Sequence, residues 1–140
     1  MSTQQQLLNQ LKTAGYKLTP QRRAVIAALV KSANPVTNQS LHAALKPDHP
    51  EIGLVTVYRT MALLDKLGLL CRFNYGDHIS FRAGPPEHHH HLVCRGCGNV
   101  VDFTDHCPLE LQSAVERNTG FRITEHTLEF AGYCRSCQEA

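Results

Sequence analysis

The chain has 140 residues, of which 42% are hydrophobic and none is tryptophan, and its formal net charge at pH 7 is +2. This length allows one ordinary domain or two small ones, and no run approaches the ~18 apolar residues that a transmembrane helix needs, which excludes a membrane span. The N-terminus lacks the features of a secretory signal, so we expect a cytoplasmic protein whose six cysteines stay reduced and serve as metal ligands.

The charge is divided unevenly along the chain. Residues 1–82 contain ten lysines and arginines against four acidic residues, a net charge of +6, whereas residues 83–140 contain four against eight, a net charge of −4. The break falls at Ala83-Gly84-Pro85-Pro86, a composition that favours an extended linker. We therefore predict a domain over 1–82 that meets a polyanion, a hinge over 83–87, and a cation-binding domain over 88–140.

Short helices and a hairpin are predicted in the first half. A helix near 7–14 ends at Gly15, and Thr19-Pro20 begins the next, because threonine caps a helix and proline suits its first position. Two more helices follow, the second over 54–66. Strands at 70–73 and 78–82 flank Asn74-Tyr-Gly-Asp, which is typical of a β-hairpin. The last three of these helices, followed by the hairpin, predict a winged helix-turn-helix.

The helix over 54–66 is the one predicted to enter the major groove of double-stranded DNA. Val57, Met61 and Leu64 would face inward, so the other side of the helix is left for solvent or DNA. Arg59 is the best candidate for a phosphate or guanine contact and Tyr58 for a phosphate or thymine methyl contact. The candidate DNA contacts on this helix are Thr56, Tyr58, Arg59 and Thr60, and Arg22 and Arg23 are candidate contacts to the DNA backbone. For all of them the alternative is an ordinary solvated surface.

The second half is predicted to be a small α/β module. Strands at 88–93 and 99–103 are followed by a helix over 108–118, ended by Gly120, and by a long strand over 121–130 that contains His126. A module of this size has a thin core, so a bound metal would supply much of its folding free energy. Its apolar strands suggest burial against a second copy of the chain.

Two Cys-x-x-Cys pairs predict a structural zinc site. Zinc is held by four thiolates in a tetrahedron, and each such turn supplies two of them. Two disulfides or a redox dithiol are the alternatives, and both fit poorly in a reducing compartment. The four predicted ligands are Cys94, Cys97, Cys134 and Cys137.

Four consecutive histidines precede the first pair. In a strand, side chains alternate between faces, so His88 and His90 would point one way and His89 and His91 the other. The two imidazoles on each face could supply ligands to two separate metal sites. A purification tag or a solvated histidine patch is the alternative, although a tag usually lies at a terminus.

These motifs resemble the Fur family of bacterial metal-dependent transcriptional regulators over nearly the whole chain. The resemblance rests on Leu-Thr-Pro-Gln-Arg at 18–22, Gly-Leu-Val-Thr-Val-Tyr-Arg-Thr at 53–60 and the histidine run with its Cys-x-x-Cys-Gly at 88–98, together with His126 and the last Cys-x-x-Cys. It implies a homodimer with an N-terminal winged helix and a C-terminal dimerisation domain, an α+β fold. It also implies a palindromic, AT-rich operator.

The resemblance also implies the regulatory metal ligands. One site would combine His89, His91 and Asp102 with Cys71 from the first domain, and another would combine His88, His90 and His126. Glutamate is the usual fourth ligand of the second site; Glu110 lies nearby, and Cys107 could substitute. For both cysteines the alternative is a small buried apolar residue. Iron- and peroxide-sensing members usually take a histidine and an acidic residue where this chain has Asn34-Pro35 and Arg82. The remaining thiolate and imidazole donors favour zinc, so the chain is most similar to the zinc-sensing branch, Zur.

The leading hypothesis is therefore a zinc-responsive repressor of zinc homeostasis genes, with both structural and regulatory Zn²⁺. An iron- or peroxide-responsive regulator is the alternative within the family. A zinc deaminase would need a His-x-Glu motif together with Pro-Cys-x-x-Cys. Val93 precedes Cys94 here, so the second part of that signature is missing and we do not expect an enzyme. A zinc buffer would leave the basic first half and its helix at 54–66 without a role.

Overall fold

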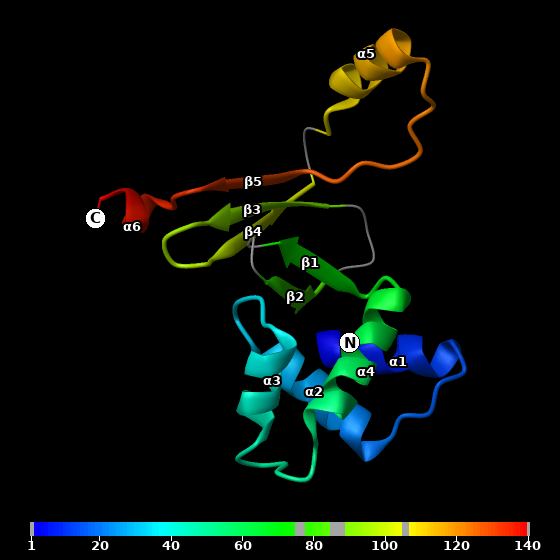
Figure 1. The fold of residues 1–140 in the computed structure, drawn as a ribbon, viewed down its shortest axis with the longest axis vertical. Coiled ribbons are helices and arrows are strands. Elements are labelled where there is room, and N and C mark those ends of the chain that lie inside the picture. Colours follow the sequence, from blue (N-terminus) through cyan, green and yellow to red (C-terminus); the bar gives the residue numbers. More distant parts are fainter. Residues whose placement is uncertain (1, 75–77, 85–88, 105–106, 140) are drawn as a thin grey trace. The chain divides into compact units, whose positions relative to one another are not determined.

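A computed structural model of the chain describes residues 2–74, 78–84, 89–104 and 107–139. They belong to two compact units, Met1–Pro86 and Glu87–Ala140, each with its own sheet (Figure 1). Among the described residues, no helix has both the length and the apolarity that crossing a bilayer requires. The α+β architecture predicted from the sequence is confirmed, with a helical first unit and an α/β second unit.

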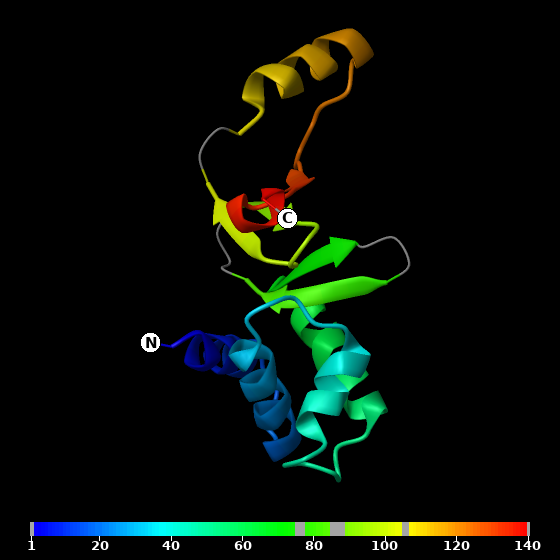
Figure 2. The same cartoon turned by 90° about the vertical axis from the view of Figure 1, so that its left-hand side faces the viewer.

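The first unit is a helical bundle followed by a hairpin. Leucine, isoleucine and valine side chains from all four helices form one buried core, which includes Leu11, Ile26, Leu41 and Leu64. The hairpin lies on one side of the bundle (Figure 2). The helices are α1 (Thr3–Thr13), α2 (Pro20–Lys31), α3 (Asn38–Leu45) and α4 (Leu54–Lys66).

Local capping explains where these helices begin and end. The Thr19 hydroxyl accepts a hydrogen bond from the backbone N–H of Arg22 at 3.2 Å, ahead of Pro20 at the first position of α2. Thr37 and Ser40 form a reciprocal capping box at the start of α3. Gly68 follows α4 with a φ of 74°, a left-handed conformation that favours glycine.

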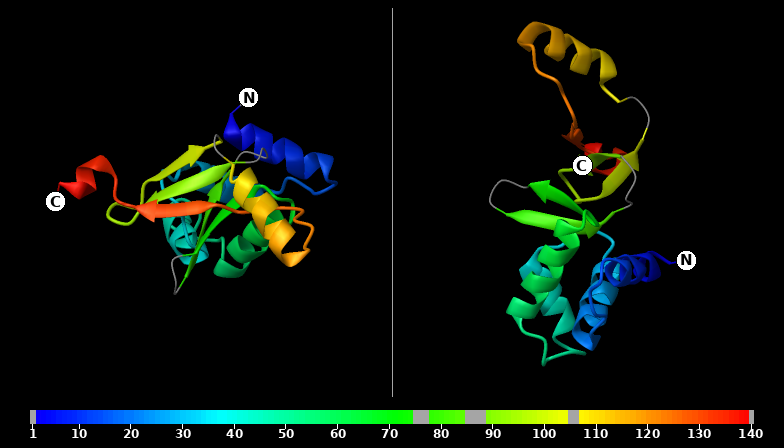
Figure 3. Two further views of the ribbon diagram at one scale, coloured as in Figure 1. Left: turned by 90° about the horizontal axis from the view of Figure 1, so that it is seen from above. Right: turned by 90° about the vertical axis from the view of Figure 1, so that its right-hand side faces the viewer.

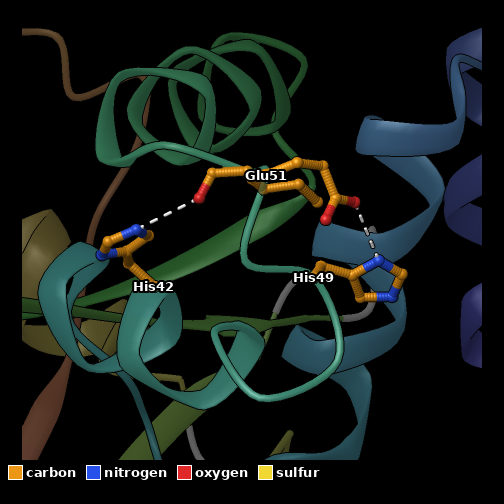
Figure 4. A network of polar contacts seen from close by, with 4 residues as sticks. His42, His49 and Glu51 are labelled. Atoms are coloured by element: carbon orange, nitrogen blue, oxygen red, sulfur yellow. Dashed lines mark hydrogen bonds and ion pairs between the residues drawn. The ribbon is translucent and has the colours of Figure 1, made fainter.

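The loop before α4 is held by two histidines (Figure 4). The His42 Nε2 atom lies 3.1 Å from the carbonyl oxygen of Ile52, and the His49 Nδ1 atom lies 3.3 Å from Glu51 Oε1. Ile52 is itself buried in the core. These contacts hold the chain directly before Gly53, the N-cap residue of α4.

The predicted hairpin consists of β1 (Leu70–Asn74) and β2 (Ile79–Ala83), paired antiparallel with Leu70 opposite Ala83. Phe81 also bridges to Val36, which ties the hairpin to the segment before α3. The predicted turn at 74–77 falls largely outside the described residues, as do most of the hinge predicted at 83–87 and the predicted ligand His88.

The second unit is built on a three-stranded sheet in the order β4-β3-β5 (Figures 1 and 3). The central strand β3 (His90–Cys94) pairs antiparallel with β4 (Val100–Phe103) and parallel with β5 (Glu129–Gly132). The parallel pairing places Cys94 opposite Gly132, two residues before Cys134. A short helix, α6 (Arg135–Gln138), follows.

The long strand predicted over 121–130 is wrong. Only Glu129 and Phe130 of that range are in β5, and residues 120–128 form no ladder with another described segment. Alternating apolar residues such as Phe121 and Ile123 favour an extended backbone, but a strand also requires a partner at its edge. His126 therefore lies in an irregular segment.

The predicted helix over 108–118 is present as α5 (Leu109–Thr119), and it ends at Gly120, whose φ is 76°. It lies away from the sheet of its own unit (Figures 1 and 2), and none of its residues is buried. Large apolar side chains are exposed on α5, on the strands of this unit and in the segments next to them: Leu92, Val101, Leu109, Leu111, Val115, Phe121, Phe130 and Tyr133.

Candidate metal centres and DNA-binding surface

The four cysteines of the two Cys-x-x-Cys turns, here called the knuckles, are brought together in the second unit. Cys94 ends β3, and the first knuckle closes where the Gly98 N–H donates to the Cys94 carbonyl at 2.9 Å. The second knuckle begins at Cys134, directly after β5, so the parallel β3–β5 pairing juxtaposes the two turns. The sulfur atoms of Cys94, Cys97, Cys134 and Cys137 all lie within 4.8 Å of one another.

This geometry fits a zinc ion. Tetrahedral bonds of ~2.3 Å place neighbouring sulfur atoms about 3.8 Å apart, and the Sγ atoms of Cys97 and Cys134 are 3.9 Å apart. All four cysteines are free thiols, so the alternative of disulfides has no support here. The structure thus contains the donor set predicted for the structural site.

The thiols of this cluster differ in acidity. The Cys134 backbone N–H donates to Cys94 Sγ at 3.3 Å, and this contact, with the backbone of Cys97, lowers the pKa of the Cys94 thiol from 9.0 to about 6. Hydrogen bonds with the side chains of Cys134 and Cys94 raise the pKa of Cys137 to about 12. Four crowded sulfur atoms resist full ionisation without a cation, so this cluster suits a divalent ion.

Gly96 is required at its position by the second knuckle. A Cβ atom there would lie 2.7 Å from Cys137 Sγ and 2.9 Å from Cys137 Cβ, closer than carbon and sulfur atoms pack. Because the Cys137 side chain is short, it cannot move aside without leaving the cluster. The glycine lets the two turns approach each other.

A second group of candidate ligands lies at the other end of the same sheet. His90 is 1% exposed, and its Nε2 atom lies 3.2 Å from Cys107 Sγ. The ring of His126 stacks on that of His90 with centroids 5.3 Å apart. One ligand atom from each of His90, Cys107 and His126 lies within 4.8 Å of the others. Two imidazoles and a thiolate form a donor set that suits zinc.

Sequence reasoning did not identify a fourth polar group at this cluster. The Nδ1 atom of His126 lies 3.0 Å from Gln112 Oε1, and both side chains are half-buried. A glutamine on a helix carries no metal-binding signature of its own. Gln112 contacts His126 only because residues 120–128 fold back along α5, and no local sequence pattern predicts this.

His89 and His91, on the other face of the histidine run, lie close to each other and to Asp102. The rings of His89 and His91 are 4.6 Å apart, and His91 Nδ1 lies 2.9 Å from Asp102 Oδ1 on β4. His90, between them, is buried on the opposite side, which agrees with the alternation expected of a strand. A metal-binding histidine commonly donates its second ring N–H to a carboxylate, which fixes the orientation of the ring.

Cys71 is buried on β1 in the first unit, while His89 and His91 belong to the second. The expectation that Cys71 shares a metal ion with His89 and His91 stays a prediction. The same is true of His88 in the site of His90 and His126.

The outward side of α4 contains most of the predicted DNA contacts. Arg59 and Tyr58 are exposed, and Thr56 is half-buried. The side-chain amide of Gln39 on α3 donates to the Tyr58 hydroxyl oxygen at 3.1 Å, a contact that sequence reasoning missed. The expectation that Thr60 faces outward is wrong: it is 3% exposed, and its hydroxyl is satisfied within the helix by donating to the Thr56 carbonyl at 2.9 Å.

Arg22 lies beside this side of α4. Its Nη1 donates to the Lys17 carbonyl at 2.7 Å, which holds the guanidinium near the start of α2. An open hollow of about 250 Å³ lies between the start of α2 and the outward side of α4. Two guanidinium groups and a helix N-terminus make it suitable for a phosphate group; the residues that line it are Thr19, Gln21, Arg22, Thr56, Arg59 and Thr60.

Comparisons with known proteins identify the family. The family model described as the ferric uptake regulator family matches residues 13–131. The chain is 37% identical over 133 residues to the ferric uptake regulation protein of Bacillus subtilis (strain 168), which covers 91% of this chain and 89% of that protein. It is 33% identical over 129 residues to the peroxide-responsive repressor PerR of Staphylococcus aureus (strain USA300), with 92% and 87% covered.

A solved zinc uptake regulator in complex with zinc and DNA has a similar fold, with a TM-score of 0.76 at 21% identity over 99% of this chain and 97% of that one. The chain therefore belongs to the ferric uptake regulator family. Members of this family are metal-binding, DNA-binding, dimeric transcriptional regulators and not enzymes, as the sequence motifs predicted.

Proposed function

We propose that this member of the ferric uptake regulator family is a cytoplasmic, zinc-responsive repressor that controls genes of zinc homeostasis. The observation that carries the proposal is the donor set of the second cluster. His90 Nε2 lies 3.2 Å from Cys107 Sγ, so a soft thiolate stands where a hard carboxylate would favour iron or manganese. Zinc binds well to such mixed sulfur and nitrogen sites.

Two positions support the choice of zinc over iron. Resemblance to the iron- and peroxide-sensing members predicts ligands at the places of Asn34 and Arg82. The Arg82 guanidinium instead lies over the Phe73 ring, 5.8 Å from its centroid, and a guanidinium does not bind a cation. Asn34 is exposed in the turn after α2.

The proposed zinc ions have separate roles. Cys94, Cys97, Cys134 and Cys137 would hold a structural ion that ties the end of the chain to β3. His90, Cys107 and His126, with His88, would hold a regulatory ion whose charge offsets the thiolate. The second regulatory site, from the family resemblance, would use His89, His91, Asp102 and Cys71.

DNA recognition is assigned to the outward side of α4. Arg59 and Tyr58 would reach base edges or phosphates in the major groove, Thr56 would contact the same strand, and Arg22 would bind a backbone phosphate at the hollow. A homodimer would present two such helices to a palindromic, AT-rich operator. The exposed apolar side chains of α5 and β5 supply a surface that a second copy would cover.

The alternative is an iron- or peroxide-responsive regulator. It is favoured by the identities of 37% and 33% to ferric uptake and peroxide-responsive proteins. DNA binding by the metal-stripped protein separates the two: buffered Zn²⁺ should restore it, whereas Fe²⁺ and Mn²⁺ should not. Restoration by Fe²⁺ or Mn²⁺ alone would establish the alternative.

A further inference from the structure

The ring of His126 is contacted from the helix α5 as well as from His90 on the sheet. His126 lies in the irregular segment 120–128, which forms no ladder with another described segment. This segment returns from α5 to β5 (Figure 1). Three side chains of α5 contact it: Gln112 Oε1 lies 3.0 Å from His126 Nδ1, Glu116 Oε2 accepts from the Ile123 N–H at 3.1 Å, and Thr119 Oγ1 accepts from the Phe121 N–H at 3.3 Å. Gln112 and Glu116 are four residues apart, so they lie on one face of α5.

The contact with Gln112 selects a state of the imidazole. A neutral histidine bears its proton on one ring nitrogen and a lone pair on the other. Because an amide oxygen can only accept, Gln112 Oε1 favours the proton on Nδ1 and leaves the lone pair on Nε2. Histidine ligands commonly bind a metal through one nitrogen while the other donates to a fixed acceptor. His126 is thus prepared to ligate through Nε2.

We propose that Gln112 is a positioning residue for the metal site of His90, Cys107 and His126. It sets the tautomer of His126 and directs the ring toward the other two ligands, without touching the ion. This rests on the proposed function of that cluster as a metal site. It also assigns a role to the inward side of α5, a helix with no buried residue.

The variant Gln112→Leu, of similar size, removes the acceptor, and Gln112→Glu keeps an acceptor oxygen at the same distance along the side chain. Glu116→Ala is the matched control, because it removes another contact between α5 and the segment but leaves His126 its partner. A role in holding the segment alone would make Gln112→Leu and Glu116→Ala equivalent.

Two readouts are needed. Nitrogen chemical shifts of the His126 ring, in metal-free regulatory sites at about pH 8.5 where an ordinary imidazole is neutral, report the tautomer without any metal. Competition with a chromophoric chelator then reports Zn²⁺ and Co²⁺ affinity at the second site while the four cysteines stay loaded.

We expect the proton on Nδ1 in the unaltered protein and in Gln112→Glu, and a mixture of tautomers in Gln112→Leu. Affinity should fall roughly 10–100-fold in Gln112→Leu and return in Gln112→Glu, with a smaller loss in Glu116→Ala. A proton on Nε2 in the unaltered protein, or equal losses in Gln112→Leu and Glu116→Ala, overturns the positioning role. If the unaltered protein binds no second metal, the proposed function of the cluster fails instead, while the tautomer still reports what Gln112 does.

Discussion

His90 Nε2 and Cys107 Sγ lie 3.2 Å apart, in a cluster that His126 completes. We expect Cys107→Glu to reduce the preference for Zn²⁺ over Mn²⁺ by at least about tenfold, equivalent to ~1.4 kcal/mol, because a hard carboxylate replaces a soft thiolate. Competition titrations with both metals measure this ratio.

Titration with Co²⁺ tests the same ligand by absorption spectroscopy. Co²⁺ at the second site should give a sulfur-to-metal charge-transfer band in the unaltered protein, and Cys107→Glu should abolish it. An unchanged band in the variant, with the four knuckle cysteines filled by zinc, would show that Cys107 is not a ligand.

The structural site should be required for folding of the second unit. Cys94→Ser should remove one zinc ion per chain and the cooperative unfolding of Glu87–Ala140. Structural zinc contributes about 10–16 kcal/mol in small zinc domains, whereas a whole domain is stable by roughly 5–15 kcal/mol. Metal analysis and thermal unfolding test this, with Cys107→Ser as the control that keeps this ion. A folded dimer of Cys94→Ser with an unchanged zinc content would contradict the assignment.

Gly96→Ala should weaken the same site without removing a ligand. The new Cβ would lie 2.7 Å from Cys137 Sγ, so the knuckles must separate, at a cost of about 1–3 kcal/mol for overpacking. Zinc affinity should fall by the corresponding factor in a chelator competition. Gly132→Ala is the control, since nothing lies within 4 Å of its added Cβ. Equal affinities for the two variants would refute the proposed need for glycine.

Arg59→Ala should weaken DNA binding while leaving zinc content and dimerisation unchanged, because the side chain is exposed on α4. A loss of about 1–3 kcal/mol that depends on sequence would indicate a guanine contact. An equal loss on all duplexes would indicate a phosphate contact. Lys31→Ala removes the same charge at the far end of α2 and should have little effect. If Arg59→Ala binds DNA as tightly as the unaltered protein, α4 is not the recognition helix.

Local chemistry explains why the first unit was predictable. Thr19-Pro20 and Gly68 mark helix ends through capping and backbone preference alone, so the sequence places α2 and α4 correctly. The outward position expected for Thr60 is wrong because it rests on the polarity of the side chain alone. A threonine can satisfy its hydroxyl on the preceding turn and then be buried, as its bond to the Thr56 carbonyl shows.

The second unit was less predictable because its strands depend on distant partners. Alternation places His90 and His91 on opposite faces correctly, but it cannot say which edge of β3 receives β5. The strand predicted at 121–130 failed for this reason. The contact between Gln112 and His126 depends on how α5 and segment 120–128 approach each other, which no local pattern encodes.

The central claim, a zinc-responsive repressor, is tested most directly by DNA binding under metal buffering. A duplex is first selected from a random pool with Zn²⁺, Fe²⁺ and Mn²⁺ all present, and its fluorescence anisotropy is then followed with each metal alone at free concentrations that a cytosol maintains. We expect Zn²⁺ to produce tight, dimeric binding, and Fe²⁺ and Mn²⁺ to leave the protein unbound. Tight binding with Fe²⁺ or Mn²⁺, and none with Zn²⁺, would contradict the claim.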